Sequence, residues 1–272
     1  MKNTKNFLAL VTGATSGIGY ATACALAQKG HPVFAIGRRD DRLQALKTQL
    51  QSLNPQAEHF TAPVDMSKEN EILQFVESHK EKWSQLKILI NNAGLARSTE
   101  SFHNVDWQDI SEMMDVNVKG LLKITHLLLP CLIENSKAES HSNPTGKMQV
   151  VDPAHIVNLG SVAGRWTYPG GTAYCASKFA VRAISEGLRL DLLGKNIRVT
   201  NIEPGMVNTE FSEVRFRDKQ KADSLYAGMT PLSAEDIAQS IVWCLDRPAH
   251  VNIQEMVIYP TQQAAVGQVH RV

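Results

Sequence analysis

The sequence predicts an α/β protein, a doubly wound parallel sheet of about seven strands with helices on both faces. Two observations lead to this fold class. Short apolar runs alternate with longer amphipathic segments along the 272 residues, as expected for strands joined by crossover helices. The first of these runs, residues 7–11, passes through a glycine-rich loop into an alanine-rich helix. We therefore expect residues 1–272 to form a single domain.

The composition argues against several classes of protein. The net charge of +1 gives no general attraction to nucleic acid or to an anionic membrane. No apolar run reaches about 18 residues, so we expect no transmembrane helix. The four cysteines contain no C-x-x-C pair, which fits free thiols in a reducing cytoplasm. The nine histidines show no ligand spacing, so we expect no metal site.

The loop after the first strand is typical of a phosphate site. Glycines let the backbone approach a pyrophosphate, and the following helix supplies N–H donors and a positive dipole. This context favours dinucleotide binding on a Rossmann-like sheet over a plain glycine-rich turn. The residues expected to contact the cofactor here are Gly13, Thr15, Ser16, Gly17, Ile18 and Gly19.

The second strand, residues 33–36, ends in Gly37 and two arginines. An NAD site usually carries an acidic residue here, which binds the ribose 2′-hydroxyl. Arg38 and Arg39 would instead bind a 2′-phosphate, which favours NADP(H) over NAD(H). The alternative is that both are surface residues. We assign the next two aspartates to the start of a helix over 42–53, where acidic side chains suit the N-terminus.

The third strand, 57–64, is expected before a helix over 68–82, which Asp65 can cap. The fourth strand, 87–90, is followed by small residues that let the backbone pass close to a ribose. A helix beginning at Asp106 then carries Asn117, which is unfavourable inside a helix. Either a local kink there serves function, or Asn117 lies on a solvated helix face.

Residues 135–152 form a polar, turn-rich segment without periodicity, which predicts a surface insert. It enters the fifth strand, 155–159, at the amino end. Ligands of parallel sheets bind at the carboxyl ends of the strands. We therefore expect the insert to lie opposite the active site.

The fifth strand ends at Ser161, and a helix with Tyr174 and Lys178 follows. These two residues are four positions apart, so their side chains share one helix face. A phenol titrates near pH 10, and a fixed ammonium beside it favours the phenolate and lowers its pKa. The pair is thus predicted to be a general acid and base near neutral pH.

The last third of the chain is expected to cover the site. A sixth strand, 197–202, leads into the polar residues 206–228, which we call the lid segment. A capping signature at Ser233 begins a helix that ends near Leu245, and residues 256–258 form the predicted last strand.

These motifs, in this order, resemble the short-chain dehydrogenase/reductase family. The resemblance rests on Gly13-x-x-x-Gly17-x-Gly19, Asn91-Asn92-Ala93-Gly94 and the Ser161, Tyr174 and Lys178 spacing. It implies hydride transfer at the nicotinamide of NADP(H). Ser161 would bind the substrate oxygen, Tyr174 would exchange the proton, and Lys178 would also hold the nicotinamide ribose. Asn117, the fourth catalytic residue, would support a water that relays protons.

The resemblance also implies further cofactor contacts. Asp65 would lie beside the adenine ring, and Thr209 would bind the nicotinamide carboxamide. The positions carried over from the family, besides the glycine loop and the arginines, are Asp65, Met66, Asn91, Ala93, Gly94, Tyr174, Lys178, Pro204, Gly205, Val207 and Thr209.

Within the family, residues 37–39, 203–205, 209–216 and 248–253 together look like those of NADP-dependent serine and 3-hydroxy acid dehydrogenases. A 3-hydroxy acid such as serine or allo-threonine carries a carboxylate, which Arg215 in the lid segment could bind, together with Ser161 on the substrate oxygen. Arg165 is a rival for this role, and Arg215 could also be a plain surface residue.

Two other functions remain open. One is a reductase for a 3-ketoacyl thioester or a hydrophobic ketone, and the other is an NADPH-binding sensor or scaffold. The family resemblance implies a small-molecule substrate and a homo-oligomer, a dimer or homotetramer.

Overall fold

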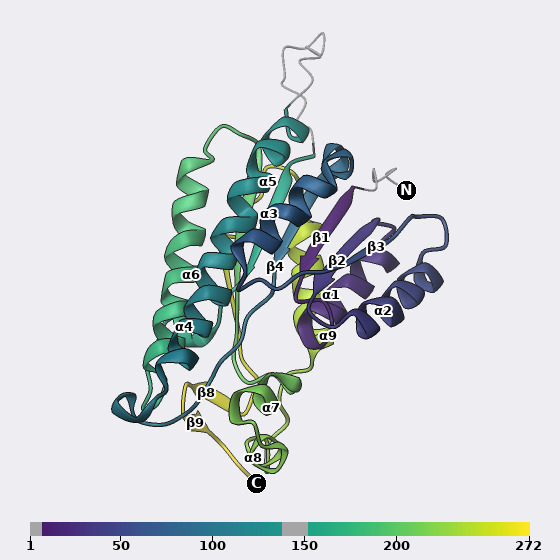
Figure 1. The fold of residues 1–272 in the computed structure, drawn as a ribbon. Helices are drawn as coiled ribbons and strands as arrows, with labels where there is room; N and C mark the ends of the chain where they lie inside the picture. The colour runs from purple at the N-terminus through teal and green to yellow at the C-terminus, as the bar shows by residue number, and fades with distance from the viewer. Residues whose placement is uncertain (1–6, 138–151) are drawn as a thin grey trace.

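The structure is a computed structural model that describes residues 7–137 and 152–272. A parallel sheet crosses its middle (Figure 1), with the strand order β3-β2-β1-β4-β5-β6-β7. The strands are β1 Leu8–Thr12, β2 Val33–Gly37, β3 Phe60–Pro63, β4 Leu86–Asn91, β5 Ala154–Leu159, β6 Ile197–Pro204 and β7 Glu255–Ile258. The order reverses direction between β1 and β4. The doubly wound sheet is confirmed, and its switch point is where such sheets bind ligands.

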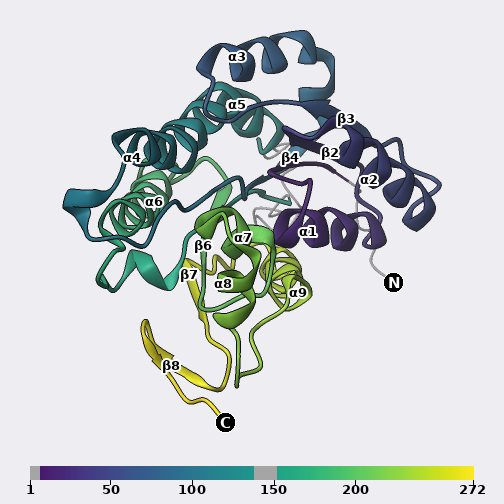
Figure 2. The same ribbon diagram turned by 60° about the horizontal axis from the view of Figure 1, so that its bottom comes forward.

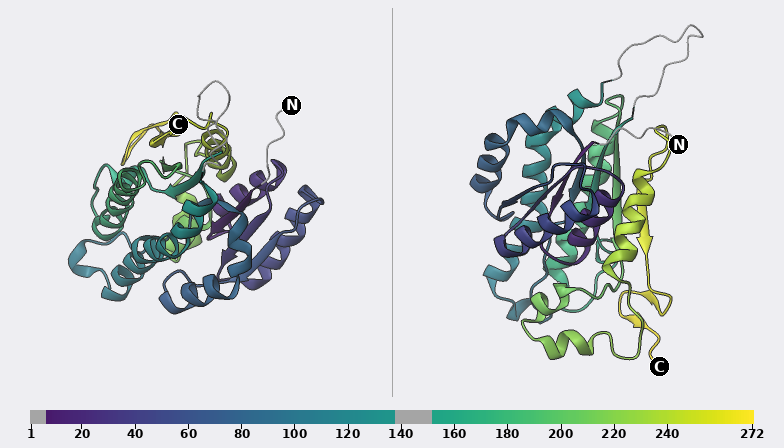
Figure 3. Two further views of the ribbon diagram at one scale, coloured as in Figure 1. Left: turned by 90° about the horizontal axis from the view of Figure 1, so that it is seen from above. Right: turned by 90° about the vertical axis from the view of Figure 1, so that its right-hand side faces the viewer.

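Two layers of helices enclose the sheet (Figure 2). Helices α3, α5 and α6 cover one face, and α1, α2 and α9 cover the other, as both views of Figure 3 show. The helices are α1 Gly17–Gln28, α2 Asp40–Leu53, α3 Glu69–Ser78, η1 Lys80–Gln85, η2 Phe102–Asn104, α4 Trp107–Met114, η3 Asp115–Gly120, α5 Leu121–Asn135, η4 Val162–Gly164, α6 Thr172–Asp191, α7 Glu210–Phe216, α8 Lys219–Ser224 and α9 Ala234–Leu245.

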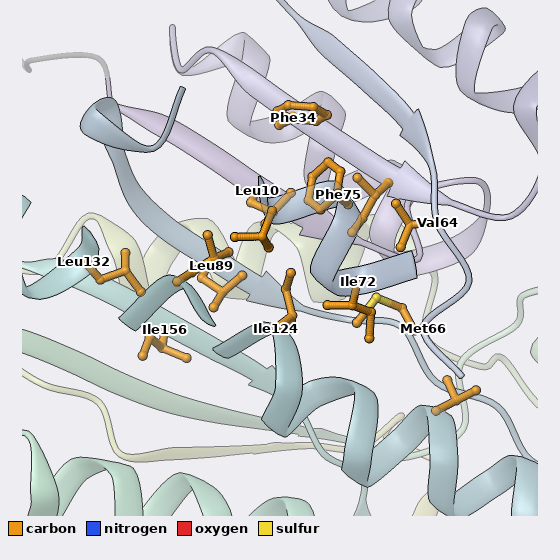
Figure 4. Packing of buried hydrophobic residues seen from close by; sticks show 14 of the residues in the cluster. Leu10, Phe34, Val64, Met66, Ile72, Phe75, Leu89, Ile124, Leu132 and Ile156 are labelled. Atoms are coloured by element: carbon orange, nitrogen blue, oxygen red, sulfur yellow. The ribbon is translucent and has the colours of Figure 1, made fainter. Parts of the chain in front are cut away.

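The central strands are continuous apolar runs because both of their faces are buried. In β1, every residue is buried, and successive side chains enter opposite layers. Leu10 packs with Phe34 and Leu89 under α3 and α5 (Figure 4). Ala9 and Val11 pack on the other side, under α1 and α2. This packing holds the carboxyl ends of the strands rigidly in place.

The structure differs from the predicted elements at three points. The helix expected over 68–82 is divided into α3 and the 3₁₀ helix η1. The lid segment contains two short helices, α7 and α8. The strand predicted over 256–258 is present as β7, but it is not the last of the chain, because β8 (Gln263–Ala265) and β9 (Gln268–Val269) form an antiparallel hairpin after it. Short strands of mixed polarity leave no periodic pattern in the sequence.

Most of the predicted insert, residues 138–151, lies outside the described residues. One helical run, Trp107–Asn135, is by length and composition able to cross a membrane. In the structure it packs on the sheet and buries Ile124, Leu128 and Leu132 in the core. Its apolar character is thus that of a core helix.

Candidate active site

A cleft of about 760 Å³ lies at the carboxyl end of the sheet, between the strand ends and the lid segment. Helices α7 and α8 and the β8–β9 hairpin gather at this end (Figure 1). The cleft brings together most residues predicted from the sequence. Those that line it are Gly13, Thr15, Ser16, Gly17, Ile18, Arg38, Arg39, Asp65, Met66, Ala93, Gly94, Ser161, Tyr174, Lys178, Pro204, Gly205, Val207, Thr209 and Arg215.

Three predicted residues support the cleft from outside it. Gly19 lies inside α1, where a Cβ atom would come within 2.5 Å of the Gly13 carbonyl oxygen. Asn91 is buried under the cleft and donates to Thr125 Oγ1 and Asn158 Oδ1, both at 2.9 Å. Asn117, the third, is buried beside Gly94. Small or hydrogen-bonding residues at these positions shape the walls of the cleft.

The glycine loop fits a bound phosphate. Gly13 and Gly17 have positive φ angles of 65° and 55°, which favour glycine. A Cβ atom on Gly13 would lie 2.8 Å from Ala93 Cα, so glycine also permits the close approach to the segment after β4. Helix α1 begins at Gly17, and its N-cap Ser16 makes no side-chain capping bond. This helix end therefore keeps N–H donors for an anion.

Ser161, Tyr174 and Lys178 meet at the centre of the cleft. Ser161 follows β5 and caps η4, where its hydroxyl accepts a hydrogen bond from the Ala163 N–H at 3.1 Å. Tyr174 and Lys178 lie on one face of α6 and are 8% and 6% exposed. The Lys178 ammonium donates to the Leu159 carbonyl at 2.7 Å and lies 5.9 Å from the centroid of the Tyr174 ring.

The pKa values differ from the expectation that Lys178 makes the Tyr174 phenol acidic. Burial and the neighbouring Tyr168 raise the pKa of Tyr174, and its hydrogen bond to Ser161 and the charge of Arg215 only partly oppose this. Burial lowers the pKa of Lys178 to about 8. Desolvation disfavours both charged forms, and the ammonium is bound to a carbonyl rather than to the phenol. In this arrangement Tyr174 is a protonated acid at neutral pH.

The helix is irregular at Asn117, as expected, and the alternative of a solvated helix face is wrong. Residues 115–120 form the π-helical turn η3, in which Asn117 is 1% exposed. Its side chain accepts from the Leu95 N–H at 2.8 Å and donates to the Leu95 carbonyl at 2.8 Å and to Ser177 Oγ at 3.0 Å. A single π-turn commonly marks a functional site. Asn117 thus joins the segment after β4 to α6, two elements of the cleft wall.

Replacing Asn117 by alanine should lower the free energy of unfolding. The change leaves three buried polar groups without their partner, each of which costs about 1–3 kcal/mol, so we expect a loss of about 2–4 kcal/mol after relaxation. Urea unfolding followed by circular dichroism measures it. Lys119→Ala, on the same turn but exposed, is the control; an equal effect in both variants would contradict the role of the amide.

Arg215 belongs to the site and Arg165 does not. The Arg215 guanidinium carbon lies 5.7 Å from the centroid of the Tyr174 ring and 5.5 Å from that of Tyr168. Its Nε donates to the Ser98 carbonyl at 3.2 Å. Arg165 is bound instead to the carboxylates of Glu203 and Glu255. Of the two arginines, only Arg215 therefore lines the cleft beside the phenol.

Sequence reasoning missed several residues of the cleft. Tyr168 and Phe211 flank Tyr174, and the Phe211 ring centroid lies 5.8 Å from that of Tyr174. Gln263, at the start of β8, accepts from the Met206 N–H at 2.8 Å. The aromatic residues between Ser161 and Tyr174 were a signal for Tyr168. The C-terminal hairpin reaches the site only through the tertiary fold.

A family model described as short chain dehydrogenase matches residues 8–220. The chain belongs to this family. This short-chain dehydrogenase is 40% identical over 267 residues to an NADP-dependent 3-hydroxy acid dehydrogenase of Salmonella typhi, covering 97% of this chain and 99% of that one. It is also 41% identical over 258 residues to sulfoacetaldehyde reductase 2 of Chromohalobacter salexigens, covering 94% and 95% of the two chains.

A solved structure shows the same likeness. The closed form of serine dehydrogenase complexed with NADP+ superposes with a TM-score of 0.85 at 39% identity, covering 97% of this chain and all of that chain. The short-chain dehydrogenase described here is thus an oxidoreductase, and its cleft corresponds in position to the dinucleotide site of the fold.

Proposed function

We propose that this enzyme interconverts a small 3-hydroxy acid, such as serine or allo-threonine, and its carbonyl form with NADP(H). The position of one side chain supports an acidic substrate: the Arg215 guanidinium lies beside the ring of Tyr174, inside the cleft. A substrate whose oxygen reaches the phenol places a nearby carboxylate within range of this cation. Arg–carboxylate pairs are among the strongest polar contacts. The NADP(H) dependence of the 3-hydroxy acid dehydrogenase relative supports the same cofactor here.

The residues of the cleft suit this reaction. The bound nicotinamide supplies the hydride acceptor or donor. Ser161 donates a hydrogen bond to the substrate oxygen, and the protonated Tyr174 gives that oxygen its proton during reduction. Lys178 contributes a cation next to the phenol and a donor for ribose hydroxyls. Asn117 bonds both α6 and the segment after β4 and so fixes the position of Tyr174 and Lys178 relative to the cleft wall.

We assign the cofactor contacts to the residues expected from the sequence. The glycine loop and the N-terminus of α1 bind the pyrophosphate. Asp65 and Met66 border the adenine, and Thr209, with Pro204, Gly205 and Val207, borders the nicotinamide.

A substrate panel tests the proposal. The enzyme is assayed at 340 nm with NADP+ and 3-hydroxy acids, and with NADPH and ketones with or without an acidic group. We expect turnover of acidic substrates with NADP(H) and a lower kcat/KM with NAD(H). Equal activity on neutral, bulky ketones would favour the hydrophobic carbonyl alternative. Binding of NADPH without oxidation by any carbonyl would favour the sensor.

A second candidate is the reduction of a small sulfonated aldehyde. Arg215 can bind any compact oxyanion, and the sulfoacetaldehyde reductase relative is 41% identical. A sulfonate is larger than a carboxylate and remains charged at every pH of the assay. Adding sulfonated and carboxylated aldehydes of equal length to the panel separates the two through the ratio of their kcat/KM values.

Arg215→Ala should raise the KM for a 3-hydroxy acid by about 10- to 100-fold, the usual contribution of a charged hydrogen bond. The KM for the corresponding neutral alcohol should change little. Steady-state kinetics with both substrates checks this. Arg217→Ala is the control: it removes a positive charge from the same segment, but this arginine pairs with Asp109 at 2.6 Å, so the KM should not change. An unchanged KM in Arg215→Ala would dismiss the carboxylate contact.

We also infer that the enzyme assembles as a dimer or homotetramer in the cytoplasm. Several large apolar side chains are exposed on the helices over one face of the sheet. They include Trp107 at 75%, Leu122 at 42%, Phe179 at 40% and Leu190 at 60% exposure. Apolar groups gathered on neighbouring helices favour burial between subunits.

A further inference from the structure

Two ion pairs from Glu210, the first residue of α7, tie the lid segment to the start of α2. Glu210 Oε2 accepts from Arg39 Nη1 at 2.8 Å, and Glu210 Oε1 accepts from Arg42 Nη1 at 2.5 Å. Both arginines lie at the start of α2, where Arg39 is the N-cap and Arg42 is in the first turn, far from α7 in the sequence. One carboxylate therefore joins the lid segment to the opposite wall of the cleft.

The donors of Arg39 are already engaged by the protein. Its Nε and Nη2 donate to Thr15 Oγ1 at 3.2 and 2.9 Å, and Nη2 also donates to Ser16 Oγ at 2.8 Å. Nη1 binds Glu210. Each nitrogen of this guanidinium thus has a partner, and the partners are the glycine loop and the lid segment. This arginine organises the cleft and has little capacity left for a further anion.

Arg38 is in the opposite situation. Its side chain is 54% exposed, and its Nη1 lies 3.8 Å from Glu112 Oε1. Glu112 is itself held by two bonds from Arg97, at 2.8 and 3.0 Å, so it binds Arg38 only weakly. The Arg38 guanidinium lines the cleft and is available for a phosphate.

The lid segment also touches the phosphate loop through Thr209, the N-cap of α7. A Cβ atom on Gly17 would lie 3.2 Å from Thr209 Cβ and 3.3 Å from its Cγ2. The N-terminus of α7 thus lies against the start of α1. Arg215, which lies beside Tyr174, is on the same helix, six residues after Thr209.

We propose that Glu210 is a positioning residue, a clasp that holds α7 closed over the bound dinucleotide through its ion pairs with Arg39 and Arg42. Arg38 keeps the role expected from the sequence, contact with the 2′-phosphate. The clasp rests on the proposed function only in that a dinucleotide occupies the cleft. A nucleotide under the lid segment leaves after both ion pairs break. Since α7 carries Arg215, the clasp also sets the position of the substrate's counter-charge.

The charge of Glu210 is maintained at neutral pH. Partial burial opposes its ionisation, but the hydrogen bonds from Arg39 and Arg42 outweigh burial and hold its pKa below the ordinary value. The opposite arrangement would be competition, in which the 2′-phosphate displaces Glu210 from Arg39. The two arrangements predict different nucleotide selectivity when the carboxylate is removed.

The decisive variants are Glu210→Gln, Arg38→Ala and the control Glu213→Gln, which changes an exposed residue of the same helix. Dissociation of NADPH and NADH is followed by stopped-flow fluorescence. Affinities for 2′,5′-ADP and 5′-AMP, which lack the nicotinamide, are measured by calorimetry. We expect Glu210→Gln to speed release of both dinucleotides about three- to tenfold, because two partly exposed ion pairs are lost. The ratio of the two fragment affinities should stay unchanged.

Arg38→Ala should abolish the preference for 2′,5′-ADP, and Glu213→Gln should match the wild type. Release from the wild type should also quicken with salt, which screens the pairs, and this salt dependence should be weaker in Glu210→Gln. In the double variant Arg39→Met/Glu210→Gln, the effects should be clearly less than additive, since both changes break one pair.

Two results would overturn the clasp. Tighter binding of 2′,5′-ADP relative to 5′-AMP in Glu210→Gln would show competition. Unchanged release rates in that variant would show that the ion pairs of Glu210 do not slow nucleotide release. Failure of the wild type to bind either fragment would overturn the dinucleotide assignment itself, and this outcome is distinct because it precedes any comparison of variants.

Discussion

Replacing Tyr174 by phenylalanine is expected to reduce kcat by about 10²- to 10⁴-fold, the usual contribution of a positioned general acid. The change removes only the phenolic hydroxyl, and the ring keeps its contacts with Phe211 and Arg215. The shape of the cleft is therefore preserved. Nucleotide affinity, measured by fluorescence titration, should stay within a factor of about two, because a near-isosteric change leaves the packing intact.

Tyr20→Phe is the matched control, since it removes a hydroxyl from a tyrosine of α1 that is 37% exposed. Ser161→Ala should lower kcat as well, because it removes the second donor to the substrate oxygen. A kcat close to that of the wild type in Tyr174→Phe would refute proton transfer by the phenol. Loss of nucleotide binding in that variant would instead point to a disturbed cleft.

Lys178→Met should abolish turnover and, at the same time, stabilise the fold. Burial lowers the pKa of Lys178 from 10.5 to about 8, which corresponds to about 3 kcal/mol of unfavourable free energy for the charged form. Methionine of similar volume avoids this cost. It leaves the Leu159 carbonyl without its donor, which costs about 1–3 kcal/mol. The expected net gain is about 0–2 kcal/mol, together with loss of activity.

The pH dependence of this gain has a defined sign. Between pH 8 and 10.5 the unfolded lysine binds a proton that the folded one has lost, so the wild type becomes more stable as the pH rises through this window. The advantage of Lys178→Met is therefore largest below pH 8 and shrinks toward pH 10.5. Urea unfolding of both proteins at pH 7 and above pH 9 measures it. If Lys178→Met is less stable than the wild type at pH 7, burial of the Lys178 ammonium does not destabilise the fold.

Much of the fold could be read from local patterns. Buried parallel strands are continuous apolar runs, and glycines at the end of β1 have conformations open to few other residues. The pattern was weakest where structure depends on contacts between distant segments. The sequence of the β8–β9 hairpin has no hydrophobic periodicity, and its Gln263 accepts a hydrogen bond from the Met206 backbone N–H of the lid segment. No local signal encodes such a contact.

The candidate site divides in the same way. Chain order and helix geometry are enough to predict which residues stand at the strand ends and that Tyr174 and Lys178 share a helix face. That Arg215 rather than Arg165 lies beside the phenol is visible only in the folded structure. It alone also decided that Arg39 holds the lid segment and that burial, not the ammonium, controls the pKa of Tyr174. Charge pairing and desolvation depend on which groups the fold brings together, and spacing along the chain does not specify them.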